Sequence, residues 1–264
     1  MRKLILALLF LQLGSGAFSQ SKVKLLKGMY LQWGYNKEWY TNSTIHFKGS
    51  VNGVPHDFTL YHARGHDQTN FDAVYKEPVQ ISVPQYNYRI GFYLNSKHTR
   101  AIEINYDHTK YVVYDNQLVH VKGYFGKNTI DKDTSFANSD MHFEHTNGAN
   151  FYQVNYVREY NLKNKKNRQF IRALWKGGAG ILVPKTDVTL FGKRLDNRFH
   201  VAGYCIGLEG GGKIYPFGKH LFFEGTAKTG FANYLNSLTV DGGKAQHHFA
   251  YFELIGLVGY DIKF

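Results

Sequence analysis

The feature that most constrains the fold is a two-residue alternation over the last thirteen residues, Phe252 to Phe264. Every second residue from Phe252 is aromatic, aliphatic or glycine, and the residues between them include Glu253, Asp261 and Lys263. A period of two places alternate side chains on opposite faces of a β-strand. The segment therefore predicts a strand with one apolar face and one charged face.

Similar alternation recurs along the chain and predicts eight strands, near residues 29–36, 85–95, 102–107, 149–162, 171–181, 202–213, 221–231 and 252–264. The connections near residues 96, 165 and 217 are short. Those over 37–84, 115–146, 184–198 and 235–246 are long, and the second of them includes a candidate β extension over Leu118–Phe125. This alternation of short and long connections is typical of a transmembrane antiparallel up-and-down β-barrel with short periplasmic turns and long extracellular loops.

The closing segment resembles the last strand of bacterial outer-membrane β-barrels, which typically ends in Phe after aromatic or aliphatic residues at alternate positions. Here Phe264 follows Ile262, Tyr260 and Val258 at that spacing. In topology the chain resembles the OmpA- and OmpX-type small barrels. The resemblance implies an all-β barrel in the outer membrane of a Gram-negative bacterium.

The first residues predict export. Arg2 and Lys3 precede an apolar run from Leu4 to Leu11 and a segment of small residues, the pattern of a secretory signal peptide. We expect a signal peptide over 1–19 and one barrel domain over 20–264. Within that domain, residues 44–49 and 56–63 read as a hairpin, which either belongs to a long external loop or adds two spanning strands to give ten.

The alternation does not by itself say which face meets lipid, because a soluble lipocalin-like barrel carries its apolar face inside. Strands of ten or more residues, and Trp and Tyr near their ends, favour a membrane crossing. Glycine on the polar face favours a narrow, crowded lumen, and it occurs there at Gly34, Gly91, Gly178, Gly180, Gly203, Gly207 and Gly211. We therefore expect lipid against the apolar face.

The charges on the inward face nearly cancel. They are Arg89, Arg172, Lys176, Lys213 and Lys228 against Glu103, Asp107, Glu159, Glu209, Glu224 and Glu253. An eight-stranded barrel is just wide enough for side chains to fill it. We expect these charges to pair and close the lumen. The alternative is a narrow polar channel lined by the same residues.

One segment suggests catalysis. His145-Thr146-Asn147-Gly148 resembles the His-x-Ser-Asn element of lipid A deacylases of the PagL type. The resemblance implies a hydroxyl nucleophile, a His base and an orienting carboxylate. It covers four residues, and Asn147 stands where that family has its Ser. The nucleophile is therefore missing from its expected position, and a hydrogen-bonded histidine at the edge of a loop is the alternative interpretation.

The thirteen histidines include two groups that invite a metal, His62 with His66 and Asp67, and His142 with His145. Neither has the paired spacing of known metal sites. We expect loop histidines here and assign no catalytic, cofactor-binding or metal-binding residue.

A glycine-rich segment and the one cysteine complete the candidates. Gly207 to Lys213 matches most of a phosphate-binding loop, but Ile214 replaces the Ser or Thr that holds magnesium, and no helix follows. We expect a glycine-rich strand. Cys205 has no partner for an internal disulfide, so we expect it to be a small packing residue.

A net charge of +12 and long basic loops indicate an acidic partner. The leading hypothesis is a non-enzymatic interaction barrel or an accessory subunit, whose partners are outer-membrane lipid and lipopolysaccharide, other outer-membrane proteins or surface lipoproteins, and not nucleic acid. The alternatives are a lipid A-modifying deacylase or acyltransferase, and a narrow channel.

Overall fold

The computed structural model describes residues 26–76, 85–138, 140–145, 148–162 and 170–264. The signal peptide predicted over 1–19 lies outside these residues. The described chain is almost entirely β-structure, with one short helix, α2 (Phe71–Lys76), and one 3-10 turn, η1 (Val240–Gly242). Neither of these has the length and hydrophobicity of a membrane-spanning helix.

Eight antiparallel strands close into a barrel in the order β1-β5-β6-β11-β12-β15-β16-β17, and β17 pairs back with β1. Short turns join β5 to β6 and β15 to β16, as predicted, whereas the turn predicted near residue 165 lies outside the described residues. The strands are β1 (Gly28–Tyr40), β5 (Tyr86–Tyr93), β6 (Arg100–Asp107), β11 (Phe151–Leu162), β12 (Ile171–Leu182), β15 (Gly203–Ile214), β16 (Leu221–Leu238) and β17 (Lys244–Lys263).

The predicted hairpin forms but does not join the barrel. It consists of β2 (Ser43–Val51) and β3 (Val54–Ala63), and β2 pairs with the first residues of β17, where Lys48 lies opposite Lys244. The sheet continues from β3 to β8 (Val119–Phe125) and β9 (Asn128–Thr134). The barrel therefore has eight strands and not ten.

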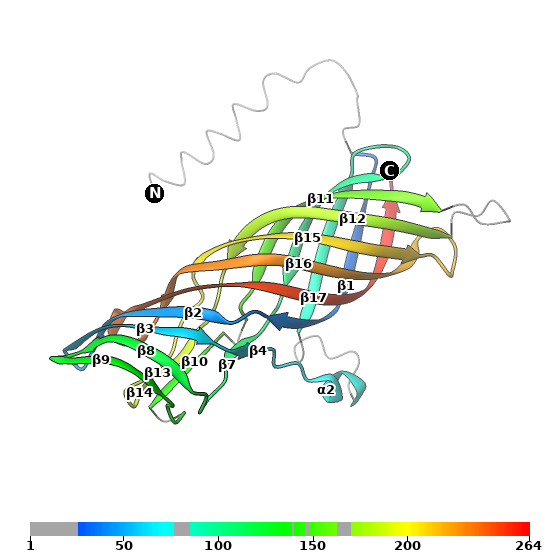
Figure 1. The fold of residues 1–264 in the computed structure, drawn as a ribbon. Helices are drawn as coiled ribbons and strands as arrows, with labels where there is room; N and C mark the ends of the chain where they lie inside the picture. The colour runs from blue at the N-terminus through cyan, green and yellow to red at the C-terminus, as the bar shows by residue number, and fades with distance from the viewer. Residues whose placement is uncertain (1–25, 77–84, 139, 146–147, 163–169) are drawn as a thin grey trace, which may run out of the picture.

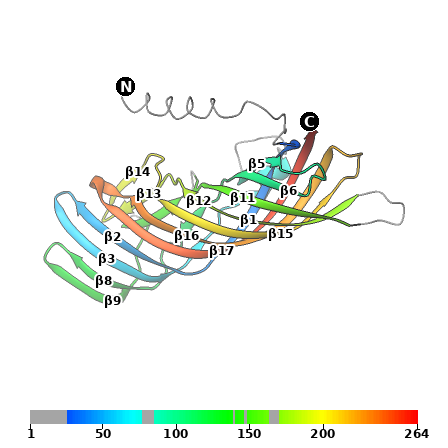
Figure 2. The same ribbon diagram turned by 90° about the horizontal axis from the view of Figure 1, so that it is seen from above.

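A second sheet of five strands packs against this extension. Its order is β14-β13-β10-β7-β4, made of β14 (Lys193–Asp196), β13 (Asp187–Leu190), β10 (Met141–His145), β7 (Tyr111–Val113) and β4 (Gly65–His66). The rings of Phe47 and Phe143, one from each sheet, lie 5.3 Å apart. We call the strands β2–β4, β7–β10, β13 and β14 the head. It lies at the end of the barrel opposite the C-terminus (Figures 1 and 2).

The head changes the interpretation of the long connections. The segments 37–84, 115–146 and 184–198 supply all of its strands except β7, and the sequence indicated only the β2–β3 hairpin and β8 among them. The loop predicted over 235–246 is wrong, because β16 runs to Leu238 and β17 begins at Lys244. These strand ends continue past the barrel since Tyr234 and Phe249 are buried in the head's core.

The outer wall of the barrel is apolar. Outward side chains such as Leu31, Ile104 and Leu208 are exposed in the isolated chain, whereas their neighbours in sequence point into the lumen. The strand register aligns tyrosines in a row near the head, formed by Tyr88, Tyr106 and Tyr152 and, beyond one isoleucine, by Tyr204. A closed barrel with an apolar wall and an aromatic girdle is a transmembrane barrel of the outer-membrane type.

Two glycines of the barrel strands, Gly91 and Gly225, provide a test of whether side chains crowd the inner or the outer face of the sheet. Gly91 faces the lumen, where an added Cβ would collide with the ring of Tyr30, and Gly225 faces outward with nothing within 4 Å. We expect Gly91→Ala to lower the free energy of unfolding by about 1–3 kcal/mol. Gly225→Ala is the matched control and should not lower it. Urea titration in lipid vesicles followed by tryptophan fluorescence measures both, and equal losses would contradict the assigned faces.

Candidate functional site

The centre of the lumen holds a network of buried charges. One amino group of Arg89 lies 2.7 Å from Glu209, and the ammonium of Lys176 lies 2.6 Å from Glu224 and 3.0 Å from Glu103. These five side chains are at most 2% exposed. Each cation contacts more than one carboxylate, so the network joins β5, β6, β12, β15 and β16 across the lumen.

Two smaller groups extend this network. Toward the end away from the head, Glu159 accepts from Lys213 at 2.6 Å and from Arg172 at 2.8 Å. Toward the head, Lys228 pairs with Asp107 and lies 3.5 Å from Glu253. All eleven charges predicted to point inward therefore lie in the lumen, and all take part in ion pairs.

The sequence analysis missed several inward residues. Glu38 is buried, but it falls in the segment that was interpreted as a loop. At the end away from the head, Tyr93 and Tyr215 donate to Asp261 at 2.8 and 3.0 Å. The ammonium of Lys213 lies 4.2 Å from the centroid of the Tyr30 ring. Aromatic residues on the lumen-facing side of these strands interrupt the alternation of apolar and polar residues. The sequence pattern therefore did not indicate this cluster.

Removing one cation from the network should be costly. Lys176→Met leaves Glu103 and Glu224 buried without that partner, so we expect a loss of about 3–5 kcal/mol in the free energy of unfolding. Lys185→Met is the matched control, because Lys185 pairs with Asp196 at the surface and its loss should cost about 0–1 kcal/mol. Urea titration in vesicles compares the two variants. Equal losses would show that the lumen pairs contribute no more than a surface pair.

The candidate base His145 lies in the buried junction of head and barrel. One ring nitrogen lies 3.1 Å from the hydroxyl of Thr186, and the other lies 3.1 Å from Nε2 of His247. The hydroxyl of Ser43 lies 3.4 Å from the second ring nitrogen of His247. The ring of Tyr234 stacks on both imidazoles, with centroids 4.7 and 4.6 Å away.

This arrangement differs from the one that the deacylase resemblance implies. Thr146 and Asn147 lie outside the described residues. Among the residues that the structure describes, His145 forms hydrogen bonds with Thr186 and His247, and neither is a carboxylate. The His145 side chain is fully buried. These contacts stabilise packing at the junction, and they do not assemble a base with an orienting acid.

In the metal candidate that includes His66 and Asp67, each of these side chains contacts different neighbours. One ring nitrogen of His66 lies 2.9 Å from the backbone carbonyl of Asp67, and its ring packs at a tilt of 35° against the ring of Tyr114. The carboxylate of Asp67 accepts from the backbone of Glu38 and lies 3.4 Å from Lys37. No group of three or more His, Cys, Asp or Glu side chains within the described ranges has metal-binding geometry.

The glycine-rich segment and the cysteine are structural. Gly207 to Lys213 lies inside β15, as predicted, so it forms no loop around a phosphate. Its glycines occupy both faces of the strand, since Gly210 points outward and Gly211 points into the lumen. Cys205 is fully buried in the core that joins barrel and head, which confirms its packing role.

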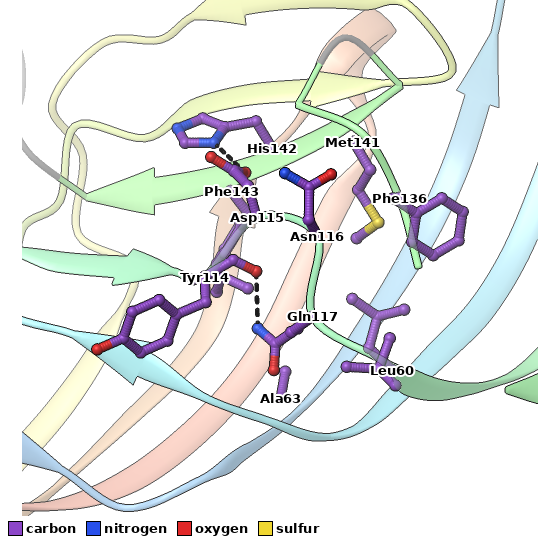
Figure 3. Close-up of a pocket in the computed structure, with 12 residues that line it drawn as sticks. Leu60, Ala63, Tyr114, Asp115, Asn116, Gln117, Phe136, Met141, His142 and Phe143 are labelled. Carbon is purple, nitrogen blue, oxygen red and sulfur yellow. Dashed lines mark hydrogen bonds and ion pairs between the residues drawn. The ribbon is translucent and has the colours of Figure 1, made fainter. Parts of the chain in front are cut away.

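A pocket opens at the edge of the head between β3 and β8 on one side and β7 and β10 on the other (Figure 3). It holds about 340 Å³ of empty space when its open mouth is counted, but the space inside it that is open to the centre of a water molecule is only about 20 Å³. Its wall is mainly apolar and is formed by Leu60, Ala63, Val113, Val119, Phe136, Met141 and Phe143. Leu118 beside it is 72% exposed. The sequence did not show this pocket, because three separate segments supply its wall.

The rim of the pocket carries a charged histidine. The two ring nitrogens of His142 lie 2.9 Å from Asp115 and 3.0 Å from Glu144. The hydrogen bond with Glu144, aided by Asp115, raises the pKa of His142 to about 9. The rim is therefore an ion-paired edge around an apolar wall at neutral pH.

The head should lose stability in acid. His145 and His247 lie beyond the membrane-facing wall, and burial lowers the pKa of His145 to about 3 and that of His247 well below its usual range. A depressed histidine pKa contributes stability above the unfolded value near 6.5, and this stability is lost as the pH falls below it. The loss for His145 is on the order of 2 kcal/mol by about pH 5.

Hydrogen exchange, corrected for its intrinsic pH dependence, measures this effect. We expect β2 and β10 to lose protection between about pH 7 and pH 5, while the middle of β11 and β12 serves as an internal control. Unchanged protection of β2 and β10 would contradict the prediction.

Comparison with known proteins gives similarity of fold only. No family model and no curated protein sequence matches the chain. OprG, an outer membrane protein from Pseudomonas aeruginosa, is 11% identical over 90% of this chain and 97% of its own, with a TM-score of 0.40. Neisserial surface protein A is 12% identical over 89% and 97%, with a TM-score of 0.36.

Ail, the attachment invasion locus protein of Yersinia pestis, is 11% identical over 90% of this chain and 99% of its own, with a TM-score of 0.36. All three are small outer-membrane proteins. At these scores the likeness carries no weight for function, and the assignment of the barrel rests on the strand pairing and the apolar wall described above.

Proposed function

We propose that the protein is a non-enzymatic binding protein of the outer membrane, in which a barrel closed to solutes holds a folded head at the cell surface for contact with a partner. The observation that carries the proposal is the head itself. Its two sheets share one buried core with the barrel's rim, including Phe47, Phe143 and Tyr251. A binding surface on such a support is held in a fixed orientation.

The filled lumen supports the proposal that the barrel is closed to solutes. Paired charges occupy its middle, Tyr30, Tyr93 and Phe222 occupy the end away from the head, and the core shared with the head occupies the other end. Opening a channel would separate buried ion pairs, each of which is costly to break. We therefore expect no discrete conductance steps in planar bilayers.

The surface beside the pocket is the best candidate for the partner contact. Leu118 is an exposed apolar side chain at its margin, and Tyr114 beside it is half-exposed, with one side of its ring against His66. Buried apolar anchors surrounded by a polar rim are the usual centre of a protein interface. The His142 rim with its two carboxylates would complete such an interface around an apolar anchor of the partner.

Site-specific photo-crosslinking in intact cells tests the proposal. A photoreactive residue at position 118 should capture one defined surface component. The same residue at position 217 is the matched control, because Phe217 is 73% exposed and Leu118 is 72% exposed, but Phe217 lies in the short turn at the opposite end of the barrel. Equal capture at both positions, or conductance steps from the purified protein, would contradict the proposal.

A further inference from the structure

A groove runs along the outer wall of the barrel over β15, β16, β17 and β1. It encloses about 1320 Å³ of empty space, including its open side. A second, smaller hollow shares Tyr35 and Gly256 with it and continues toward Trp33 and Phe223. The groove lies on the side that contacts lipid, so it is separate from the lumen and from the pocket of the head.

The groove exists because two neighbouring rows of outward residues are small. In one row, Gly212, Gly225 and Gly256 lie side by side on β15, β16 and β17, and Tyr35 follows on β1. In the next row, Gly210 and Ala227 lie beside Leu254 and Lys37. A Cβ added at Gly225 or Gly256 would meet nothing within 4 Å. Strand backbone therefore forms part of the floor.

The end of the groove nearest the head is aromatic. Phe71 of α2 and Trp39 of β1 line it there, and Figure 1 shows α2 beside the barrel on the side of the head. Trp39 also packs on Phe252, with ring centroids 5.8 Å apart. The groove is thus an open hollow along the wall with aromatic side chains at one end, and the row that carries Leu254 continues to Lys37 at that end.

Lys37 is a cation on the lipid-facing side of β1. Its ammonium lies 2.8 Å from the hydroxyl of Thr69 and 3.4 Å from the carboxylate of Asp67, and its side chain is 31% exposed. A lysine ammonium has three N–H donors, and these two contacts use two of them. The third is available to an anionic group at the depth where Trp39 marks the membrane interface.

We propose that this groove binds one acyl chain of an outer-leaflet lipid that carries phosphate monoesters, and that one of these phosphates contacts Lys37. The proposal is independent of the function proposed for the head. Two arguments support this occupant. The groove is continuous with the wall that already contacts hydrocarbon, and Lys37 supplies the complementary charge at one end.

The shape of the groove favours a chain over a second barrel. Within a bilayer, association is driven by van der Waals packing, because lipid tails are as apolar as the protein surface. A convex barrel wall of a second copy would leave the floor at Gly225 and Gly256 without contacts. A single flexible chain reaches the floor.

Native mass spectrometry tests the proposal with the full chain. The protein is equilibrated in phosphatidylcholine vesicles that contain a minor fraction of lipid A, extracted in mild detergent and weighed. We expect the wild type to retain one lipid A molecule. Gly225→Leu and Gly256→Leu fill the groove and should reduce the retained fraction at least about tenfold. Ala179→Leu is the matched control, since Ala179 is outward on β12 and outside the groove, and it should retain lipid A.

The variant Lys37→Gln tests the contact with the headgroup separately from the contact with the acyl chain. We expect this variant to retain one lipid but to lose the preference for lipid A over phosphatidylcholine. Gly225→Val provides a smaller change if a leucine variant fails to reach the folded barrel, and it should reduce retention in the same direction.

The outcomes decide the proposal. Loss of lipid A from the groove variants but not from Ala179→Leu supports it. Retention by Gly225→Leu or Gly225→Val at the wild-type level, no retained lipid in the wild type, or a wild-type dimer that the groove variants abolish would overturn it. An unchanged preference for lipid A in Lys37→Gln would overturn the assignment of the phosphate contact.

Discussion

The closure of the sheet by β1 and β17 is the constraint on which the structure depends. In hydrocarbon no water can satisfy backbone N–H and C=O groups, so a sheet must leave no edge within the membrane. Thirteen residue pairs of β1 and β17, from Gly28 with Lys263 to Tyr40 with Tyr251, meet this requirement. Closure at eight strands then fixes a narrow lumen, and everything that points inward must share that space.

The charge network follows from this narrowness. Ionised side chains cannot remain buried without partners, since desolvation costs several kcal/mol for each. Arg89 and Lys176 each reach carboxylates from more than one strand, so the ion pairs connect opposite walls. Inward glycines such as Gly91 make room for large neighbours such as Tyr30. Paired charges and their large neighbours therefore form a polar core in the lumen.

The head extends the same sheet into water. Where β1 ends, β16 and β17 continue side by side, and β17 exchanges its partner β1 for β2. On the outward face of β17, Phe252 and Leu254 give way to His248, Gln246 and Lys244. The five-stranded sheet then covers the apolar inner face of the extension. One continuous sheet thus serves as a membrane wall at one end and as half of a sandwich at the other, which couples the two parts mechanically.

The sequence by itself determined the barrel, its eight strands, its faces and its inward charges. Each strand carries its own period-two pattern, and this pattern is local, so no knowledge of the fold is needed to read it. The predicted pairing of Arg89 and Lys176 with lumen carboxylates was confirmed for the same reason. The lumen has a small volume and its side chains carry opposite charges, so few arrangements other than ion pairs are open to them.

Only the tertiary structure decided the head, the pocket and the groove. The head strands β4, β7, β13 and β14 are two to four residues long, too short for a periodic signal, and their partners lie far away in the chain. The pocket needs segments that meet only after the two sheets pack. The groove needs the register that places Gly212, Gly225 and Gly256 side by side. Contacts between distant segments, and not local periodicity, create these three features.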